Sequence, residues 1–164
     1  MLGVIVCGAE HSGTRFVWAL MELHPHIKAA HLSFPGGGRF YPVNTVVENK
    51  KFWGDIKDFV FLYVVRDKWC NLKSQERESS LNAEDAVVLS DEFFIEEMKR
   101  SNHKFLFVSY ETVVRFRDRY LRQIFENINV NPYEFDYDYE GDMDIGYSGK
   151  ISVIPKDGNE KYIK

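Results

Sequence analysis

The chain has 164 residues, of which 45% are hydrophobic and 15% aromatic, and its formal net charge is −4. This length and composition predict a single domain over residues 1–164 with a sizeable core, and they exclude a disordered chain. The acidic balance excludes a general electrostatic attraction to nucleic acid, so we expect no nucleic-acid partner.

The first part of the chain predicts two strands on either side of a helix. The apolar run Leu2–Cys7 predicts a strand that is buried on both faces. Apolar residues at helical spacing predict a helix over Ser12–Leu23, with Ser12 as its N-cap. Ile27–Phe34 predicts a second strand, and the proline and three glycines at 35–38 predict a loop.

The second part predicts the same alternation. Phe59–Val65 has the strongest strand pattern of the chain. The other predicted elements are a helix within Pro42–Ile56, a helix over Lys68–Arg77, a helix over Glu84–Arg100, a strand over Lys104–Tyr110 and a helix over Glu111–Asn127. From Asn131 the chain becomes acidic, rich in tyrosine and turn-prone, which predicts a solvated surface segment.

This alternation predicts an α/β fold, a three-layer sandwich in which a central parallel sheet has helices on both faces. No apolar run approaches the ~20 residues that span a bilayer. The chain also begins without the basic start of a signal peptide, so we expect a cytoplasmic protein without a membrane span. Cys7 and Cys70 lack the spacing of metal ligands, and we expect two reduced thiols and no metal site.

The most informative segment is Gly8–Arg15, directly after the first predicted strand. A glycine-spaced turn between a strand and a helix is typical of a phosphate-binding loop, because the glycines let the backbone approach an anion. Ser12 and Thr14 supply hydroxyls, and the helix N-terminus supplies N–H groups with partial positive charge. An ATPase loop has a lysine where Thr14 and Arg15 stand, so the segment indicates a phosphate-bearing donor other than ATP.

A second segment follows the strongest predicted strand. Arg66 stands at the end of that strand, and Ser74 follows eight residues later, about two turns along the predicted helix. A planar guanidinium and a hydroxyl placed in this way can converge on one phosphate.

Together these segments resemble the two donor-binding motifs of sulfotransferases that use 3′-phosphoadenosine 5′-phosphosulfate (PAPS). The first motif of that family is Lys-Ser-Gly-Thr-Thr or Lys-Gly-Gly-Thr-Arg, placed between a strand and a helix. The run His11-Ser12-Gly13-Thr14-Arg15 is similar to it. Arg66 and Ser74 resemble the second, a strand that ends in Arg with Ser eight residues on. Val108–Glu111 is similar to the family's Arg-Tyr-Glu after a strand, and the resemblance spans about residues 1–125.

The resemblance implies a P-loop NTPase-like fold and in-line transfer of a sulfuryl group from PAPS to an acceptor hydroxyl or amine, without a metal. Ser12–Arg15 would hold the 5′-phosphosulfate, Arg66 and Ser74 would hold the 3′-phosphate, and Lys161 in the tail would fold back on that phosphate. The residues that would bind the donor are His11, Ser12, Gly13, Thr14, Arg15, Arg66, Ser74 and Lys161.

Two histidines are the catalytic candidates. His11 stands where the family has a lysine that helps neutralise the bridging oxygen, and a protonated imidazole could donate there; the alternative is an exposed loop residue. His31, in the second predicted strand, is the candidate general base; the alternative is a core histidine. His24 and His26 are predicted to face solvent beside Pro25.

Two other functions stay open. A nucleoside or nucleotide kinase-like phosphotransferase shares the strand–loop–helix start, although it needs a lysine in the loop. A non-catalytic nucleotide-binding module is the third reading, because His11 replaces the family's lysine. We expect a small-molecule or glycan acceptor, and the residues do not rank sugar, peptide tyrosine, lipid and small alcohol. The short chain predicts an acceptor site that is either small and open or completed by a second subunit in a homodimer.

Overall fold

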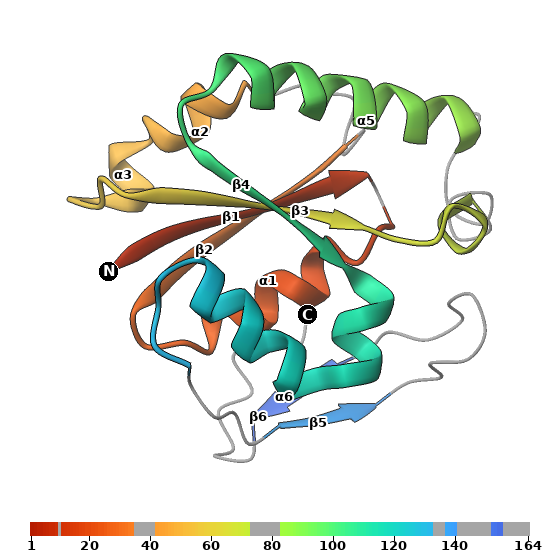
Figure 1. Cartoon of the computed structure of the whole chain (residues 1–164). Coiled ribbons are helices and arrows are strands. Elements are labelled where there is room, and N and C mark those ends of the chain that lie inside the picture. The colour runs from red at the N-terminus through yellow and green to blue at the C-terminus, as the bar shows by residue number, and fades with distance from the viewer. Residues whose placement is uncertain (10, 35–41, 73–82, 133–136, 141–151, 156–164) are drawn as a thin grey trace.

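The computed structural model describes residues 1–9, 11–34, 42–72, 83–132, 137–140 and 152–155, and it shows an α/β fold (Figure 1). The strands are β1 (Leu2–Ala9), β2 (Ile27–Phe34), β3 (Phe59–Val65), β4 (Lys104–Ser109), β5 (Tyr137–Glu140) and β6 (Ser152–Pro155). The helices are α1 (Thr14–Glu22), α2 (Val43–Val47), α3 (Lys50–Trp53), α5 (Ala83–Arg100) and α6 (Tyr110–Asn127). Residues 68–72 are helical as well.

Four strands form one parallel sheet in the order β2-β1-β3-β4. The chain leaves β1 for β2 on one side and then returns to β3 on the other side, so β1 and β3 are neighbours at a point where the winding reverses. Ligands of open α/β sheets bind outside the carboxyl ends of the strands at such a point. In this chain the two ends are Ala9 and Val65.

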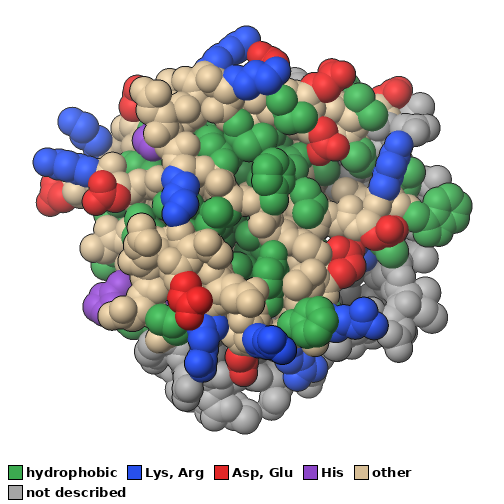
Figure 2. All heavy atoms as spheres, in the orientation of Figure 1, with side chains coloured by type: hydrophobic (Ala, Val, Ile, Leu, Met, Phe, Trp, Pro, Cys, Tyr) green, Lys and Arg blue, Asp and Glu red, His purple; other side chains and the backbone are tan. Residues whose placement is uncertain are grey.

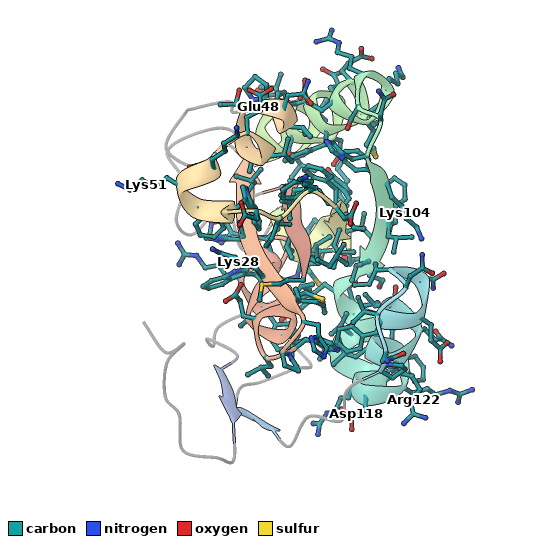
Figure 3. The ribbon with its side chains drawn as sticks, turned by 90° about the vertical axis from the view of Figure 1, so that its left-hand side faces the viewer. Lys28, Glu48, Lys51, Lys104, Asp118 and Arg122 are labelled. Carbon is teal, nitrogen blue, oxygen red and sulfur yellow. The ribbon has the colours of Figure 1, made fainter. Side chains whose placement is uncertain are left out.

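Helices cover both faces of the sheet, and the side chains of the central strands alternate between two cores. On β1, Val4 and Val6 pack with α1 and α6, whereas Ile5 and Cys7 pack on the opposite face with α2, α3 and α5. Because these side chains are fully buried, the continuous apolar run of β1 is explained by burial on both faces. Figure 3 shows the labelled charged side chains, among them Lys51 and Arg122, directed away from these cores.

The structure confirms the main predicted elements and corrects several of their ends. β2 and β3 have the predicted bounds, whereas β1 continues for two residues to Ala9. The predicted N-cap Ser12 is wrong, because Gly13 occupies the N-cap position of α1 and no side chain caps this end. Tyr110 is the first residue of α6 and not the last of the strand, because the Ser109 hydroxyl caps the helix by accepting from the Thr112 N–H at 3.2 Å.

The segments on either side of this core also differ from the prediction. The helix expected within Pro42–Ile56 is two short helices, α2 and α3, and the Asn49 side chain caps the second by accepting from the Phe52 N–H at 3.3 Å. The part of the chain after Asn131, for which only a solvated surface segment was predicted, contains the antiparallel pair β5–β6. None of the helices within the described ranges combines the length and the apolar character needed to cross a bilayer.

Candidate functional site

The turn between β1 and α1 approaches its neighbours at two glycines. At Gly8, an added Cβ would lie 2.7 Å from the Val64 carbonyl oxygen on β3. At Gly13 the backbone is left-handed, with φ of 90°, and an added Cβ would lie 2.2 Å from the Tyr110 ring. Glycine is therefore required at both places for close packing, and at Gly13 for backbone conformation too.

Arg66 connects this turn to the end of β3. Its Nη1 donates to the His11 carbonyl oxygen at 2.9 Å, and its guanidinium carbon lies 4.9 Å from the centre of the Tyr110 ring. Tyr110 is buried and also packs edge-to-face on Phe16, with ring centres 5.8 Å apart. The structure thus brings together the three segments that the sequence singles out, at the carboxyl ends of β1, β3 and β4.

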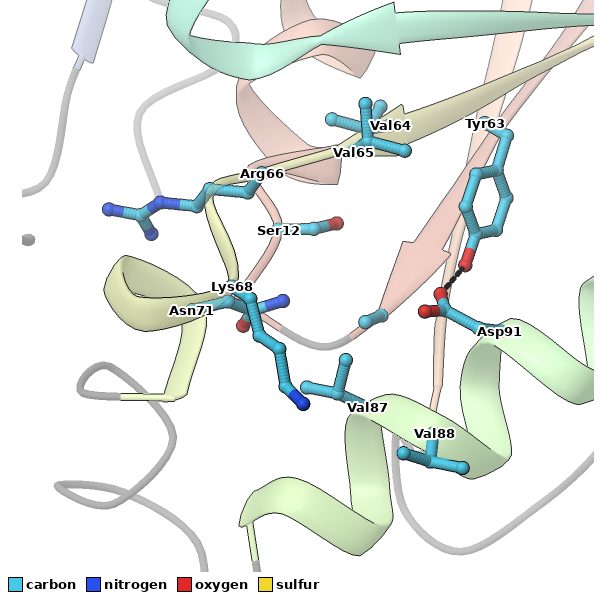
Figure 4. A pocket seen from close by; sticks show the side chains of 11 residues that line it. Ser12, Tyr63, Val64, Val65, Arg66, Lys68, Asn71, Val87, Val88 and Asp91 are labelled. Carbon is cyan, nitrogen blue, oxygen red and sulfur yellow. Dashed lines mark hydrogen bonds between the residues drawn. The ribbon is translucent and has the colours of Figure 1, made fainter.

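A cavity of about 160 Å³ lies beside this junction, on the side of the sheet that α5 covers (Figure 4). It is bordered by the β1–α1 turn, the end of β3, the 68–72 helix and α5, and it is partly open to solvent. Its lining residues are Ala9, Ser12, Tyr63, Val64, Val65, Arg66, Lys68, Asn71, Val87, Val88 and Asp91. Polar side chains of the β1–α1 turn and the 68–72 helix therefore lie at one end of the cavity, and those of β3 and α5 lie at the other. Valines line the space between the two ends.

Ser12 is the residue whose environment points most directly to a ligand. Its side chain is directed into the cavity (Figure 4), and the residue is 1% exposed. The Ser12 Oγ atom has no hydrogen-bond partner among the described residues. An unsatisfied buried hydroxyl costs about 1–3 kcal/mol. The first turn of α1, which follows Ser12 and Gly13 directly, carries no side-chain cap and no acidic residue. This end of the helix therefore suits an anion.

Lys68 and Asn71 also line the cavity, and sequence reasoning missed both. Figure 4 shows the Lys68 side chain extending toward Val87, whereas the Arg66 guanidinium is directed away from the cavity. Asn71 is 3% exposed. The signal available in the sequence was the i, i+3 spacing of Lys68 and Asn71, which places both on one face of the helix after the strongest strand.

Asp91 and Tyr63 form the opposite end of the cavity. The Tyr63 hydroxyl donates a hydrogen bond to Asp91 Oδ1 (Figure 4), and the Tyr63 ring packs edge-to-face on Phe94 at 5.2 Å. Burial raises the pKa of Tyr63 well above its usual value, and the hydrogen bond to Asp91 raises it further. Tyr63 is therefore a protonated donor at neutral pH. Asp91 is exposed on α5, four residues after the buried Val87 and three before the buried Phe94. The missed signal was therefore a carboxylate at helical spacing from two core residues.

The structure places His31 away from the cavity lining. His31 lies within β2 opposite Val6 and stacks on Trp18, with ring centres 5.3 Å apart. Burial, and then the charge of Arg15, hold the pKa of His31 below its usual value, so the imidazole is neutral at neutral pH. The imidazole of His11 does not line the cavity either, although its carbonyl oxygen binds Arg66.

One prediction about the histidines is wrong. His24 does not face solvent, because it is 2% exposed and both ring nitrogens have partners. Its Nε2 lies 3.0 Å from the Asn131 carbonyl oxygen, and its Nδ1 accepts from the His26 N–H at 3.1 Å. His24 therefore connects the end of α1 to the segment after α6, which is a structural role.

Thr14 is buried in the first turn of α1 and Arg15 is exposed beside it. Ser74 and Lys161 lie outside the described residues, as does the 35–38 loop, so their roles stay predictions. A comparison with protein-family models and with curated proteins finds no match to this chain.

Proposed function

We propose that the chain is a PAPS-dependent sulfotransferase with a P-loop NTPase-like fold, and that the cavity beside Ser12 receives the sulfuryl end of the donor. The observation that carries the proposal is the buried Ser12 hydroxyl, which faces the cavity at the uncapped N-terminus of α1 and bonds to no described residue. A tetrahedral anion there would satisfy the hydroxyl and the helix N–H groups together.

The size of the cavity fits one end of such a donor. Sites for whole small molecules have volumes of about 300–1,000 Å³, and this cavity has about 160 Å³. The cavity is therefore too small for the whole donor, and it suits the sulfuryl or phosphoryl end together with a small acceptor, with the nucleoside outside it. The resemblance assigns the 3′-phosphate to Arg66 and Ser74, and Arg66 lies on the far side of the same turn.

The side chains around the cavity have distinct chemical roles in this proposal. PAPS supplies an activated sulfuryl group when it is bound. The Ser12 hydroxyl and the N–H groups of the first turn of α1 would bind the sulfuryl oxygens, and the Lys68 ammonium would balance the charge that grows on them. Arg66 fixes the shape of the loop through the His11 carbonyl, so it orients these donors before the ligand arrives.

The acceptor and the assembly belong to the same proposal. A small-molecule or glycan acceptor would enter from the open side of the cavity. The protein would be cytoplasmic, and its thiols Cys7 and Cys70 would stay reduced. A homodimer would use the face shown in Figure 2, where hydrophobic side chains gather over β4. β4 is an edge strand of the described sheet, and its Phe107 is 61% exposed.

Calorimetric titration with adenosine 3′,5′-bisphosphate, beside ATP–Mg, tests the proposal. We expect the bisphosphate to bind without metal and ATP–Mg to bind weakly. Preference for ATP–Mg would replace the proposal with a kinase-like phosphotransferase. Bisphosphate binding without sulfuryl transfer to any member of an acceptor panel would leave a nucleotide-binding module.

A further inference from the structure

We infer that Asp91 is the catalytic base of this site, and that the acceptor is a small, uncharged hydroxyl compound with an apolar body. This inference rests on the proposed function and assigns the half of the cavity that the donor would leave free. Asp91 and Tyr63 stand at one end of the cavity, and Ser12, Asn71 and Lys68 stand at the other.

The two ends of the cavity suit ligand groups of different charge. Ser12 and the N-terminus of α1 offer donors, and Lys68 adds a positive charge, so this end attracts an anion. At the other end Asp91 offers a carboxylate, which repels an anion and accepts a proton. A hydroxyl group between the two ends would have the sulfuryl sulfur on one side and a proton acceptor on the other.

The chemistry of the step balances with these groups alone. The acceptor oxygen forms a bond to sulfur while the bond from sulfur to the bridging oxygen of the 5′-phosphate breaks. The electron pair of the broken bond leaves with adenosine 3′,5′-bisphosphate, and the proton of the acceptor hydroxyl moves to the Asp91 carboxylate. Nothing is oxidised or reduced, and no further reactant is needed.

Tyr63 is a positioning residue for this carboxylate. Its hydroxyl bonds to Asp91 Oδ1, and no described residue donates to Oδ2, so Oδ2 is the oxygen available to an acceptor. The Tyr63 ring is 4% exposed and lies between Phe94 and Phe107, which fixes the direction of the hydroxyl. Because the pKa of Tyr63 is raised, Tyr63 keeps its own proton in this hydrogen bond while Asp91 takes up the proton of the acceptor.

The walls of the cavity indicate the class of acceptor. Val65, Val87 and Val88 give it an apolar surface, which favours an aliphatic or aromatic body. A carboxylate on the acceptor would meet Asp91, and a protonated amine would meet Lys68. An uncharged alcohol or phenol avoids both repulsions.

The location of Asp91 separates it from the histidine that the sequence suggests. His31 is neutral and chemically able to accept a proton, yet it stacks on Trp18 and does not line the cavity. Asp91 lines the same cavity as the Ser12 hydroxyl. The structure therefore assigns proton acceptance to α5 and not to β2.

The test compares Asp91→Asn with Glu92→Gln, a matched loss of one carboxylate at an exposed neighbouring position outside the cavity lining. Binding of PAPS, without acceptor, is measured by calorimetry. We expect Asp91→Asn to bind PAPS about three- to tenfold more tightly, because a negative charge leaves the cavity of the sulfuryl group. Glu92→Gln is expected to bind as the wild type does.

Turnover is measured with three acceptors: water, phenol and 4-nitrophenol, which ionises near neutral pH without a base. We expect Asp91→Asn to lower the rates of sulfate release to water and of transfer to phenol by about 100-fold or more. The rate of transfer to 4-nitrophenol should change far less. Tyr63→Phe keeps the ring and should lower kcat for phenol at unchanged PAPS affinity.

Different results would overturn the donor site and the role of Asp91. A wild-type protein that does not bind PAPS or the bisphosphate would overturn the proposed function, and the role of Asp91 with it. PAPS binding that is equal in wild type, Asp91→Asn and Glu92→Gln would overturn the role of Asp91 and leave the donor site intact. Equal losses of activity with phenol and 4-nitrophenol would likewise overturn proton acceptance by Asp91.

Discussion

Replacing Ser12 by alanine should change stability and ligand affinity in opposite directions. The buried Ser12 hydroxyl bonds to no described residue, so the native protein carries the cost of its lost hydration. That cost is about 1–3 kcal/mol, and removing the hydroxyl should raise the free energy of unfolding by about 1 kcal/mol. For a domain of this size the melting temperature should rise by about 2–4 °C.

The same substitution should weaken anion binding. A hydrogen bond to a charged group contributes about 1.5–3 kcal/mol, so Ser12→Ala should raise the Kd for adenosine 3′,5′-bisphosphate or PAPS by about 10- to 150-fold. Urea unfolding measures the first effect and calorimetric titration the second, both on the same preparation.

Ser101→Ala is the matched control. The Ser101 Oγ atom accepts from the His103 N–H at 3.1 Å, between α5 and β4 at the amino-terminal edge of the sheet. Its loss should lower stability by about 1 kcal/mol and leave affinity unchanged. If Ser12→Ala destabilised the protein as Ser101→Ala does, or bound the ligand as tightly as the wild type, the ligand-facing role of Ser12 would be refuted.

Three further substitutions test the loop, its neighbour and the buried tyrosine. Gly13→Ala places a Cβ 2.2 Å from the Tyr110 ring at a φ of 90°. It should lower the free energy of unfolding, measured in urea, by about 2 kcal/mol or more. A loss under about 0.5 kcal/mol would contradict this packing. Arg66→Ala should weaken bisphosphate binding by well over ~1 kcal/mol and barely affect ATP, so equal losses in calorimetry would contradict the 3′-phosphate assignment. Because the pKa of Tyr63 is raised in the fold, its contribution to stability is complete below its usual pKa of 10.0 and is lost at higher pH, by up to about 1.4 kcal/mol per pH unit. Tyr63→Phe should therefore flatten the alkaline decline measured by urea unfolding between about pH 8 and pH 11, and an unchanged slope would show that other groups cause it.

Local sequence patterns were sufficient for the bounds of β2 and β3 and insufficient for the start of α1. β2 and β3 are continuous apolar runs bounded by turn residues, and both have the predicted bounds. The start of α1 could not be predicted in this way, because serine is a preferred N-cap residue. Gly13 takes that position because the turn packs directly on Tyr110, which comes almost a hundred residues later.

The candidate site was predictable where chemistry follows a strand end directly. Arg66 and the Gly8–Arg15 loop meet as expected, because parallel neighbours have their carboxyl ends at one edge. The direction of the Arg66 guanidinium was not predictable, since Tyr110, the first residue of α6, and the His11 carbonyl set it. Asp91 reaches the cavity only because α5 packs over β3, which is a long-range contact.

The two thiols of the chain report on different motions. Cys7 is fully buried in β1 between its neighbours β2 and β3, and burial raises its pKa well above the usual value. Cys70 is half-buried on the 68–72 helix beside the cavity residue Asn71, and burial and Asp67 raise its pKa as well. Because alkylating reagents need an accessible thiolate, Cys70 should react when the 68–72 helix opens, whereas Cys7 should react only when the sheet comes apart. The labelling kinetics of the unmodified protein therefore distinguish local opening at the ligand-binding edge from global unfolding.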